Sequence, residues 1–318
     1  MISSLLVEGC PYQVGATHYY IAALKRHAPW LLDDWEAVIS GFGCFMGGFL
    51  YALSIWDVLE RLYGSKTMAV VLERLLAINL IYLIVDFGID ADPDHSAAFI
   101  GELKICAYSI LKGGPPIAGN PHVVVSGTLL WQLMRETPAA GPFVQKAMAA
   151  EFASLEQRTC SDPVRILELS VAKSATAIQM TGVFLMGHDH CHHHLDGGDG
   201  WFHELGTVIQ LFDDLCDYHL DAAADIMTPP RCDVITNGTI DRTLHMLATA
   251  LLKLPANFWP FRVAMAPLIA TIMCDHPHVS TTYRDLALPY CPFISTGPDH
   301  DNTPIFRQAL RNHLRAHL

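Results

Sequence analysis

Five aspartates lie close together after residue 210: Asp213, Asp214, Asp217, Asp221 and Asp225. On an α-helix each residue turns by ~100°, so residues four apart stay within ~40° of one another around the helix axis. Asp213, Asp217 and Asp221 would therefore form one stripe. Gln210 and Gly206 fall on the same side, and the glycine would leave room beside it. Because like charges four residues apart repel, such a stripe needs a compensating cation.

A divalent metal is the cation that this pattern favours. Carboxylate oxygens suit Mg²⁺, which also shares phosphate oxygens with a substrate. The residues between the acids are apolar and include Leu211, Phe212 and Leu215. They indicate a buried helix, where an unpaired charge is costly, rather than a solvated acidic face. Gln210 favours the stripe 213/217/221 over the alternative 217/221/225, and both registers remain open at this point.

A second acidic pair ends another apolar helix. Asp86 and Asp90 again lie four residues apart, after an apolar run that begins at Leu80. A metal site and a polar helix end that faces water are both compatible with this pair, because Pro93 soon follows and ends the helix. Between the two acidic segments lies Lys173, the only Lys or Arg from residue 166 to residue 230. An isolated lysine either extends to the surface or faces an anion.

The lysine and the acids follow an order found in a known superfamily. Lys173-Ser174 stands in a helix of small residues, and the pattern Gly-x-x-x-Gln-x-x-Asp-Asp-x-x-Asp follows at 206–217. This order resembles trans-prenyl diphosphate synthases and their class I terpene-synthase relatives, over residues 169–221 and from Asp86 onward. The resemblance implies an all-α fold, with one helical-bundle domain over residues 1–318, a central active-site cavity and a homodimer.

The resemblance also implies the residues of the site. Two facing acidic motifs would bind a trinuclear cluster of Mg²⁺ ions that grips the diphosphate of an allylic isoprenoid. The implied metal ligands are Asp86, Asp90, Asp213, Asp214, Asp217 and Asp221, of which Asp86, Asp90, Asp213 and Asp217 would be catalytic. The implied diphosphate contacts are Lys173, Gln210 and Arg231. Cations at these positions would stabilise the charge that develops on a departing diphosphate.

A carbocation needs a dry and mostly apolar cavity, so that water does not quench it. Phe42, Phe45 and Phe49 share one face of a predicted helix, and Tyr82 lies one turn before Asp86. Aromatic ring faces stabilise cations. Phe45, Phe49 and Tyr82 are therefore candidates for the cavity wall, with ordinary core packing as the alternative.

We therefore expect a class I terpene synthase, which ionises an allylic prenyl diphosphate with Mg²⁺ and cyclises the carbocation. In the resembling family an Arg-Arg pair after the first acidic motif helps bind isopentenyl diphosphate, and no such pair follows Asp90. The alternative is a trans-prenyltransferase that joins an allylic diphosphate to isopentenyl diphosphate or another prenyl acceptor, which the Lys-Ser and Gln-x-x-Asp-Asp motifs favour. A second alternative is a catalytically silent helical partner subunit.

Composition and periodicity indicate a helical globular chain. Of the 318 residues, 51% are hydrophobic and 16% are charged, and the net charge of −12 argues against a nucleic-acid partner. Strand signals are scarce, the best being 122–127. The spacing of apolar residues predicts helices at 16–28, 33–62, 66–91, 96–112, 122–136, 141–157, 162–187, 199–226, 239–254, 257–275 and 303–317.

The remaining expectations concern location and a histidine-rich segment. The stretch from Val38 to Trp56 is about long enough for a membrane span, but its glycines and serines favour a buried helix, so we expect no transmembrane span. Scattered cysteines and the lack of a signal peptide favour a cytoplasmic protein. The segment His188–His194 is rich in metal-ligand residues, and we interpret it as part of a Gly-rich surface loop with adventitious metal affinity.

Overall fold

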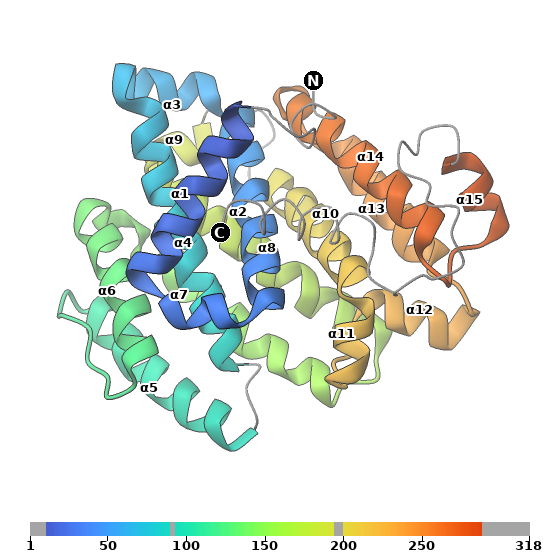
Figure 1. Ribbon diagram of the computed structural model, residues 1–318, viewed down its shortest axis with the longest axis horizontal. Helices are drawn as coiled ribbons and strands as arrows, with labels where there is room; N and C mark the ends of the chain where they lie inside the picture. The colour runs from blue at the N-terminus through green and yellow to red at the C-terminus, as the bar shows by residue number, and fades with distance from the viewer. Residues whose placement is uncertain (1–10, 90–92, 194–199, 288–318) are drawn as a thin grey trace.

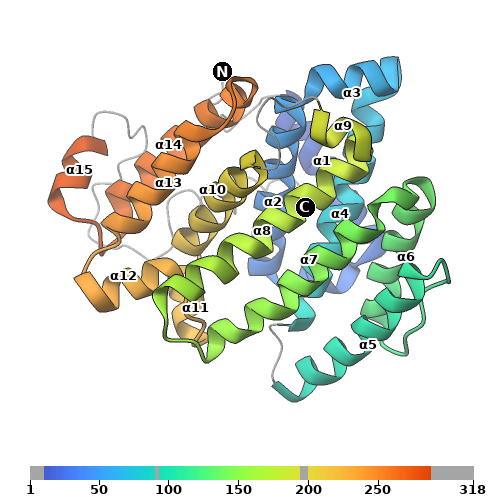
Figure 2. The ribbon, with the colours of Figure 1, turned by 180° about the vertical axis from the view of Figure 1, so that it is seen from behind.

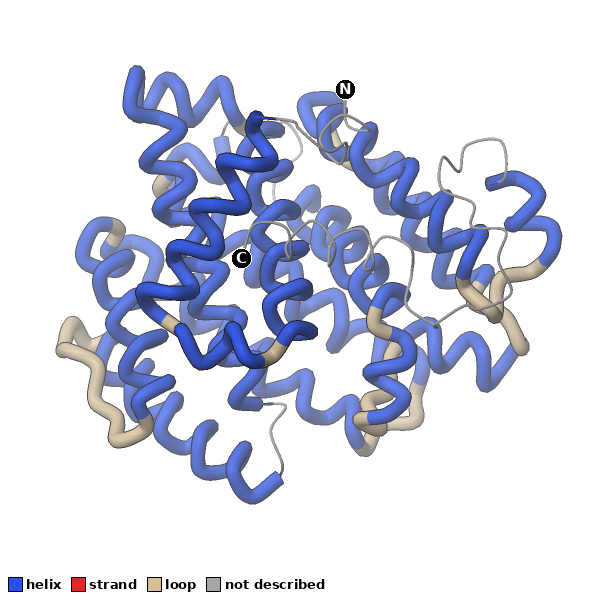
Figure 3. Tube along the Cα trace, in the orientation of Figure 1, coloured by secondary structure: helices blue, strands red, loops and turns tan. Residues whose placement is uncertain are grey.

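The computed structural model describes residues 11–89, 93–193 and 200–287. Within these ranges every regular element is a helix and no strand occurs (Figure 3). This confirms the predicted all-α class, and the segment with the best strand signal is helical as well. The helix predicted at 303–317 lies outside the described residues.

The helices comprise ten longer and five shorter elements within the described residues. The longer ones are α1 (Pro11–His27), α2 (Trp35–Ser54), α4 (Thr67–Ile89), α5 (Pro93–Leu111), α6 (Pro121–Glu136), α7 (Gly141–Ser154), α8 (Pro163–Met186), α10 (Gly200–Cys216), α13 (Asp241–Lys253) and α14 (Trp259–Asp275). The shorter ones are α3 (Trp56–Tyr63), α9 (His188–His193), α11 (Tyr218–Ala223), α12 (Pro229–Asn237) and α15 (Thr281–Ala287). Single 3-10 turns are η1 (Pro29–Asp33), η2 (Gly64–Lys66), η3 (Pro138–Ala140), η4 (Leu155–Arg158) and η5 (Ala256–Phe258).

Local sequence signals explain where several of these helices begin and end. The Asn120 side chain accepts from the backbone N–H of His122 at 2.9 Å and caps α6, and Asp162 accepts from Val164 at 3.0 Å and caps α8. A proline follows each cap, at the helix position where its missing N–H costs nothing. Helix α8 ends at Gly187, whose φ of 80° favours glycine.

Two predicted helices are interrupted, and one predicted loop contains a helix. The helix predicted at 33–62 divides into α2 and α3 at Ile55, and the helix predicted at 199–226 divides into α10 and α11 at Asp217. Both residues have backbone angles outside the α region, with ψ at 19° and 11°. The apolar spacing continues across each bend, so periodicity did not reveal it. The segment from His188, predicted as a loop, forms α9.

Five of the long helices form a ring. Helix α8 lies between α7 and α10, as the view from behind shows (Figure 2). Helix α4 packs against α2, α5 and α6. In this ring each helix contacts the next, in the order α2, α4, α8, α10 and α14, and α14 contacts α2 (Figure 1). The remaining helices pack around this ring.

Helices α8 and α10 meet at a glycine. A Cβ atom added to Gly206 of α10 would lie 2.6 Å from the backbone nitrogen of Ala175 and 2.7 Å from its Cα atom. Both distances are shorter than a real Cβ contact, so only glycine allows this approach. The room that the sequence predicts beside Gly206 is therefore occupied by the backbone of α8.

A buried aromatic cluster fixes α1 against α2. The ring of Tyr20 lies 5.4 Å from that of Phe42 and 5.9 Å from that of Phe45, between ring centroids, and all three residues are buried. The Tyr20 hydroxyl donates to the backbone oxygen of Val38 at 3.0 Å. The aromatic residues predicted on one face of α2 thus contribute to the core as well as to any cavity.

The expectation that the chain has no transmembrane span is contradicted. Three helical runs are long and apolar enough to cross a membrane, by length and composition: Ala37–Ser54, Trp56–Ile89 and Pro163–Met186. In each, 56% of the residues in the most apolar window are buried inside the protein. Glycine is frequent in membrane helices, so the glycines of α2 were no argument against a span. The predicted cytoplasmic location is contradicted with it.

A buried histidine closes the corner between α11, α14 and α15. The ring of His276, 7% exposed, packs edge-on against Tyr218 with 4.9 Å between ring centroids. Arg284 Nη2 donates to the His276 backbone oxygen at 2.9 Å. Burial, together with the nearby His278, His219 and Arg284, lowers the pKa of His276 to about 3. His276 is therefore neutral in the folded protein across the physiological range.

The α8–α10 contact predicts opposite effects for two glycine substitutions. Gly206→Ala should destabilise the protein by about 1–3 kcal/mol, because the new methyl group meets backbone atoms that cannot move aside. Gly101→Ala on α5, where a Cβ atom would meet nothing within 4 Å, should instead stabilise it by roughly 0.5 kcal/mol through the higher helix propensity of alanine. Denaturant unfolding of both variants measures the difference. Equal stability of the two would contradict the close contact.

The lowered pKa of His276 predicts that the folded protein loses stability in acid. The unfolded chain binds a proton near pH 6.5, whereas folded His276 binds one only near pH 3, so stability is retained above pH 6.5 and falls as the pH decreases below it. Between pH 7 and pH 4 this contribution amounts to roughly 3 kcal/mol. The His276→Asn variant should lack this part of the pH dependence. The control variant His245→Asn, at an exposed position, should show the same pH dependence as the wild type. Unfolding curves of His276→Asn that parallel the wild type at every pH would refute the assignment.

Candidate functional site

The ring of helices surrounds a pocket of about 360 Å³. This size lies in the range of small-molecule sites, roughly 300–1,000 Å³. The lining comes from α2, α4, α8, α10 and α14, with Asp217 at the bend after α10 and Glu151 from α7. Most lining side chains are apolar or aromatic. The charged ones are Asp86, Glu151, Lys173, Asp213 and Asp217.

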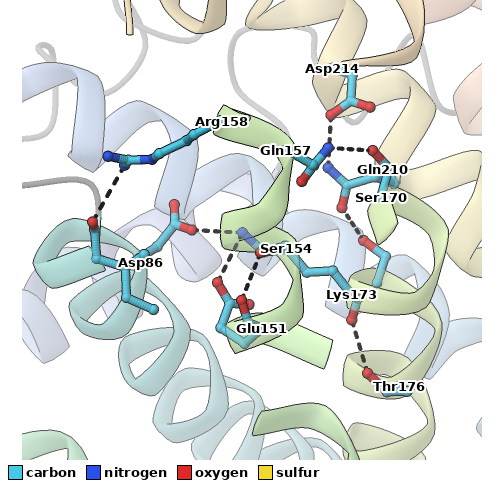
Figure 4. Close-up of polar contacts among 12 residues, drawn as sticks. Asp86, Glu151, Ser154, Gln157, Arg158, Ser170, Lys173, Thr176, Gln210 and Asp214 are labelled. Carbon is cyan, nitrogen blue, oxygen red and sulfur yellow. Dashed lines mark hydrogen bonds and ion pairs between the residues drawn. The ribbon is translucent and has the colours of Figure 1, made fainter. Parts of the chain in front are cut away.

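Lys173 lies between two carboxylates at the pocket. Its Nζ atom is 3.0 Å from Oδ1 of Asp86 on α4 and 3.1 Å from Oε1 of Glu151 on α7 (Figure 4). The Asp86 side chain is 53% exposed and that of Glu151 only 9%. The lysine therefore faces anions and does not extend away to the surface. Among the described lining residues it is the only lysine or arginine.

A hydrogen-bonded chain joins α8 to α10 beside the lysine. Ser174 Oγ donates to Gln210 Oε1 at 2.5 Å. Figure 4 shows the next bond, in which Gln210 Nε2 donates to Asp214 Oδ1 at 2.8 Å. Asp214 is buried and does not line the pocket. Burial raises the pKa of Asp214 to about 7, although the Gln210 hydrogen bond opposes this shift. Asp214, predicted as a metal ligand, thus lies between the helices and supports Gln210.

The predicted stripe of aspartates divides at the bend after α10. Asp213 and Asp217 both line the pocket that Asp86 also lines. Asp221, one turn further on, lies in α11 and is not among the lining residues, because the chain changes direction at Asp217. Asp90, the partner predicted for Asp86, lies outside the described residues.

Arg231, predicted as a diphosphate contact, closes a turn. Its Nη1 donates to the backbone oxygen of Asp221 at 3.2 Å and to that of Ile226. Its Nη2 lies 3.7 Å from Oδ1 of Asp225. The guanidinium joins the end of α11 to the start of α12 and does not line the pocket.

Two of the three predicted wall residues line the pocket. Phe45 and Tyr82 line the pocket, whereas Phe49 is buried in the core and does not. Gly43 and Gly47 also line it, and a Cβ atom at either position would meet nothing within 4 Å. The two glycines lie one turn apart on α2, so the missing side chains widen the pocket along that helix.

Glu151 is the charged residue that the sequence reasoning missed. It is the only acid in α7, and it stands among small and apolar residues, as Lys173 does in α8. An isolated acid on an apolar helix was the available signal, because a buried charge requires a partner. Glu151 and Tyr82 also line a second, smaller apolar pocket of about 60 Å³. These two side chains thus stand between the two pockets.

No preformed metal cage is present in the part of the chain that the structure describes. Within it, no group of three or more His, Cys, Asp and Glu side chains could hold a metal ion. In the histidine-rich segment, exposed His188 has Nδ1 3.2 Å from Oδ1 of Asp189. The side chains of His192 and His193, and all of His194, are outside the description, so the metal affinity of this segment stays a prediction.

Comparison with protein-family models, with curated proteins and with solved structures finds no match. The chemistry of the pocket is therefore the basis on which a function is assigned.

Proposed function

We propose that this protein is a class I terpene synthase, which with bound Mg²⁺ ionises an allylic prenyl diphosphate and cyclises the carbocation in the pocket. The observation that carries the proposal is how charge is distributed in that pocket. Four carboxylates and one ammonium group line it, from Asp86, Glu151, Asp213, Asp217 and Lys173, and most of the other lining side chains are apolar. A ligand with a metal-bound anionic group and a long apolar body fits this combination.

The charge of the pocket indicates that cations are required. Four carboxylates against one ammonium group leave a formal charge of −3, which would repel a diphosphate. Mg²⁺ is usually held by one or two carboxylates together with substrate phosphates, so the donor set fits it without a cage of three side chains. Asp86 on one side and Asp213 and Asp217 on the other would hold the ions. When bound, Mg²⁺ supplies electrostatic stabilisation of the departing diphosphate.

The residues of the chain account for the other parts of the reaction. The Lys173 ammonium group donates hydrogen bonds to the diphosphate as its allylic C–O bond breaks, and the bonding electron pair leaves with the diphosphate. A second double bond of the substrate then donates its electrons to the cation, forming a C–C bond, and loss of a proton or addition of water ends the sequence. Phe45 and Tyr82 exclude water and present ring faces to the cation.

The proposal includes the fold type. We assign the ring of α2, α4, α8, α10 and α14 to the class I terpenoid-synthase bundle, with the pocket as its active-site cavity. Two features support this assignment. The ring lines one pocket with residues of all five helices. The two motifs that carry the resemblance are also in direct contact, through the hydrogen bond from Ser174 to Gln210.

A trans-prenyltransferase is the second candidate. The Ser174–Gln210 hydrogen bond favours it too, because both motifs are shared with chain-elongating synthases. A second diphosphate substrate would however require further cationic side chains. Lys173 is the only lysine or arginine among the described lining residues, which favours an enzyme that holds one diphosphate.

Product analysis tests the proposal directly. The protein, purified from the soluble fraction and from detergent-solubilised membranes, is incubated with Mg²⁺ and allylic diphosphates of increasing length, one at a time. We expect a cyclic hydrocarbon or alcohol by gas chromatography and mass spectrometry from one of them. A longer diphosphate that forms only with isopentenyl diphosphate would identify a prenyltransferase. Absence of product together with absence of Mg²⁺-dependent pyrophosphate binding would identify a catalytically silent partner.

Adjacent aspartates on α10 provide a matched pair of variants. Asp213→Asn should lower turnover by about 100-fold or more, because a lost metal ligand removes several kcal/mol of charge stabilisation. Asp214→Asn should lower it far less, since the amide oxygen still accepts from Gln210 outside the pocket. Rates at saturating Mg²⁺ and retained helicity by circular dichroism decide the comparison. Equal losses in the two variants would sink the assignment of Asp213 as the metal-facing member of the pair.

A further inference from the structure

The two carboxylates that hold Lys173 differ in what they can do when a ligand arrives. Asp86 is half exposed, and an ion pair with an exposed carboxylate is weak and readily exchanged for water or a metal. Glu151 is buried, and removing its partner would leave an uncompensated charge inside the protein, which is strongly unfavourable. When the pocket fills, Asp86 is therefore the partner that Lys173 gives up, and Glu151 is the partner that it keeps.

We propose that Glu151 is a positioning residue that retains the Lys173 ammonium group beside the anion site when Mg²⁺ replaces Lys173 as the partner of Asp86. Held at 3.1 Å by Glu151, the ammonium group stays beside the anion site while Asp86 remains available to Mg²⁺. Without Glu151, Lys173 would lose one of the two carboxylates that it contacts and would compete more strongly with Mg²⁺ for Asp86. This inference rests on the proposed binding of a Mg²⁺-diphosphate in the pocket.

If Glu151 positions Lys173, its removal should affect anion binding in the opposite direction from the loss of its negative charge alone. Removing a negative charge beside an anion site strengthens anion binding by simple electrostatics. If Glu151 controls the partner of Lys173, its removal instead increases the Mg²⁺ concentration that anion binding requires. The direction of the change therefore separates the two roles, and the effect should depend on the presence of Lys173.

Calorimetric titration with inorganic pyrophosphate at a series of Mg²⁺ concentrations measures this directly, without turnover. For Glu151→Gln we expect the Mg²⁺ concentration for half-maximal pyrophosphate binding to rise about fivefold, the scale of one exposed ion pair. The matched control is Glu156→Gln, which removes an exposed acid paired with Arg165 on the surface beyond α7. It should leave the Mg²⁺ requirement unchanged.

The double variant Glu151→Gln/Lys173→Met completes the test, because it removes both charges of the buried ion pair together. With no ammonium group to compete for Asp86, its Mg²⁺ requirement should return to within about twofold of the wild type, while its pyrophosphate affinity at saturating Mg²⁺ falls about tenfold. If Glu151→Gln does not fold, the double variant decides by itself. A purely structural role of Glu151 would raise the Mg²⁺ requirement in the double variant as well, and that result would overturn the inference.

The outcomes also separate this inference from the function on which it rests. A wild-type protein that binds pyrophosphate with Mg²⁺, together with a Glu151→Gln variant whose Mg²⁺ requirement is unchanged or lower, would overturn the positioning role alone. A wild-type protein that binds no pyrophosphate at any Mg²⁺ concentration would overturn both.

Discussion

The close approach of α8 and α10 at Gly206 is the constraint on which the pocket depends. Because the backbone of Ala175 fills the space of a Cβ atom there, the two helices can lie together in one register only. One turn beyond the glycine, that register brings Gln210 to Ser174. It also directs Asp213 into the pocket that Lys173 lines, from the opposite helix. A single missing side chain thus sets which residues of the two helices face each other.

Apolar spacing and charge spacing predicted much of this arrangement. The helical class is confirmed, and Asp213, Asp217 and Lys173, which stand out because they are charges in apolar helices, line one pocket. Sequence could not separate Asp213 from Asp214, although neighbours on a helix point ~100° apart, because the direction of the pocket is set by other helices. Glu151 stood out as an isolated acid in α7, but its partner could not be predicted from sequence, since α7 meets α8 only through tertiary packing.

The predicted site residues at the end of the acidic segment lie away from the pocket for one reason. A stripe along a helix presumes that the helix continues, and the chain bends at Asp217 where the apolar spacing gives no sign of it. Beyond the bend, Asp221 leaves the pocket and Arg231 bonds to backbone oxygens of the following turn. Short-range spacing therefore predicts a site only as far as the helix that carries it remains straight.

The apolar helices raise a second issue that charge composition could not settle. Helices α2, α4 and α8 line the pocket, and the same helices are long and apolar enough to span a membrane. A pocket that excludes water needs apolar residues on the inner faces, but that requirement does not explain the apolar residues that face outward. Gly43 and Gly47, which sequence reasoning took as a sign of burial, face open space in the pocket. These glycines therefore widen the pocket, and a role in the membrane would depend on the residues on the outer faces of the helices.

Several acids in one small region would repel one another unless their environments differ, and here each environment assigns a different role. Asp214 reduces its charge, because burial raises its pKa to about 7. Glu151 is buried, and the Lys173 ammonium group lies 3.1 Å from its Oε1 atom and compensates it. Asp86 and Asp213 remain in contact with solvent, where a carboxylate can exchange water for a metal ion. Burial therefore decides which acids serve the structure and which remain available to bind a cation.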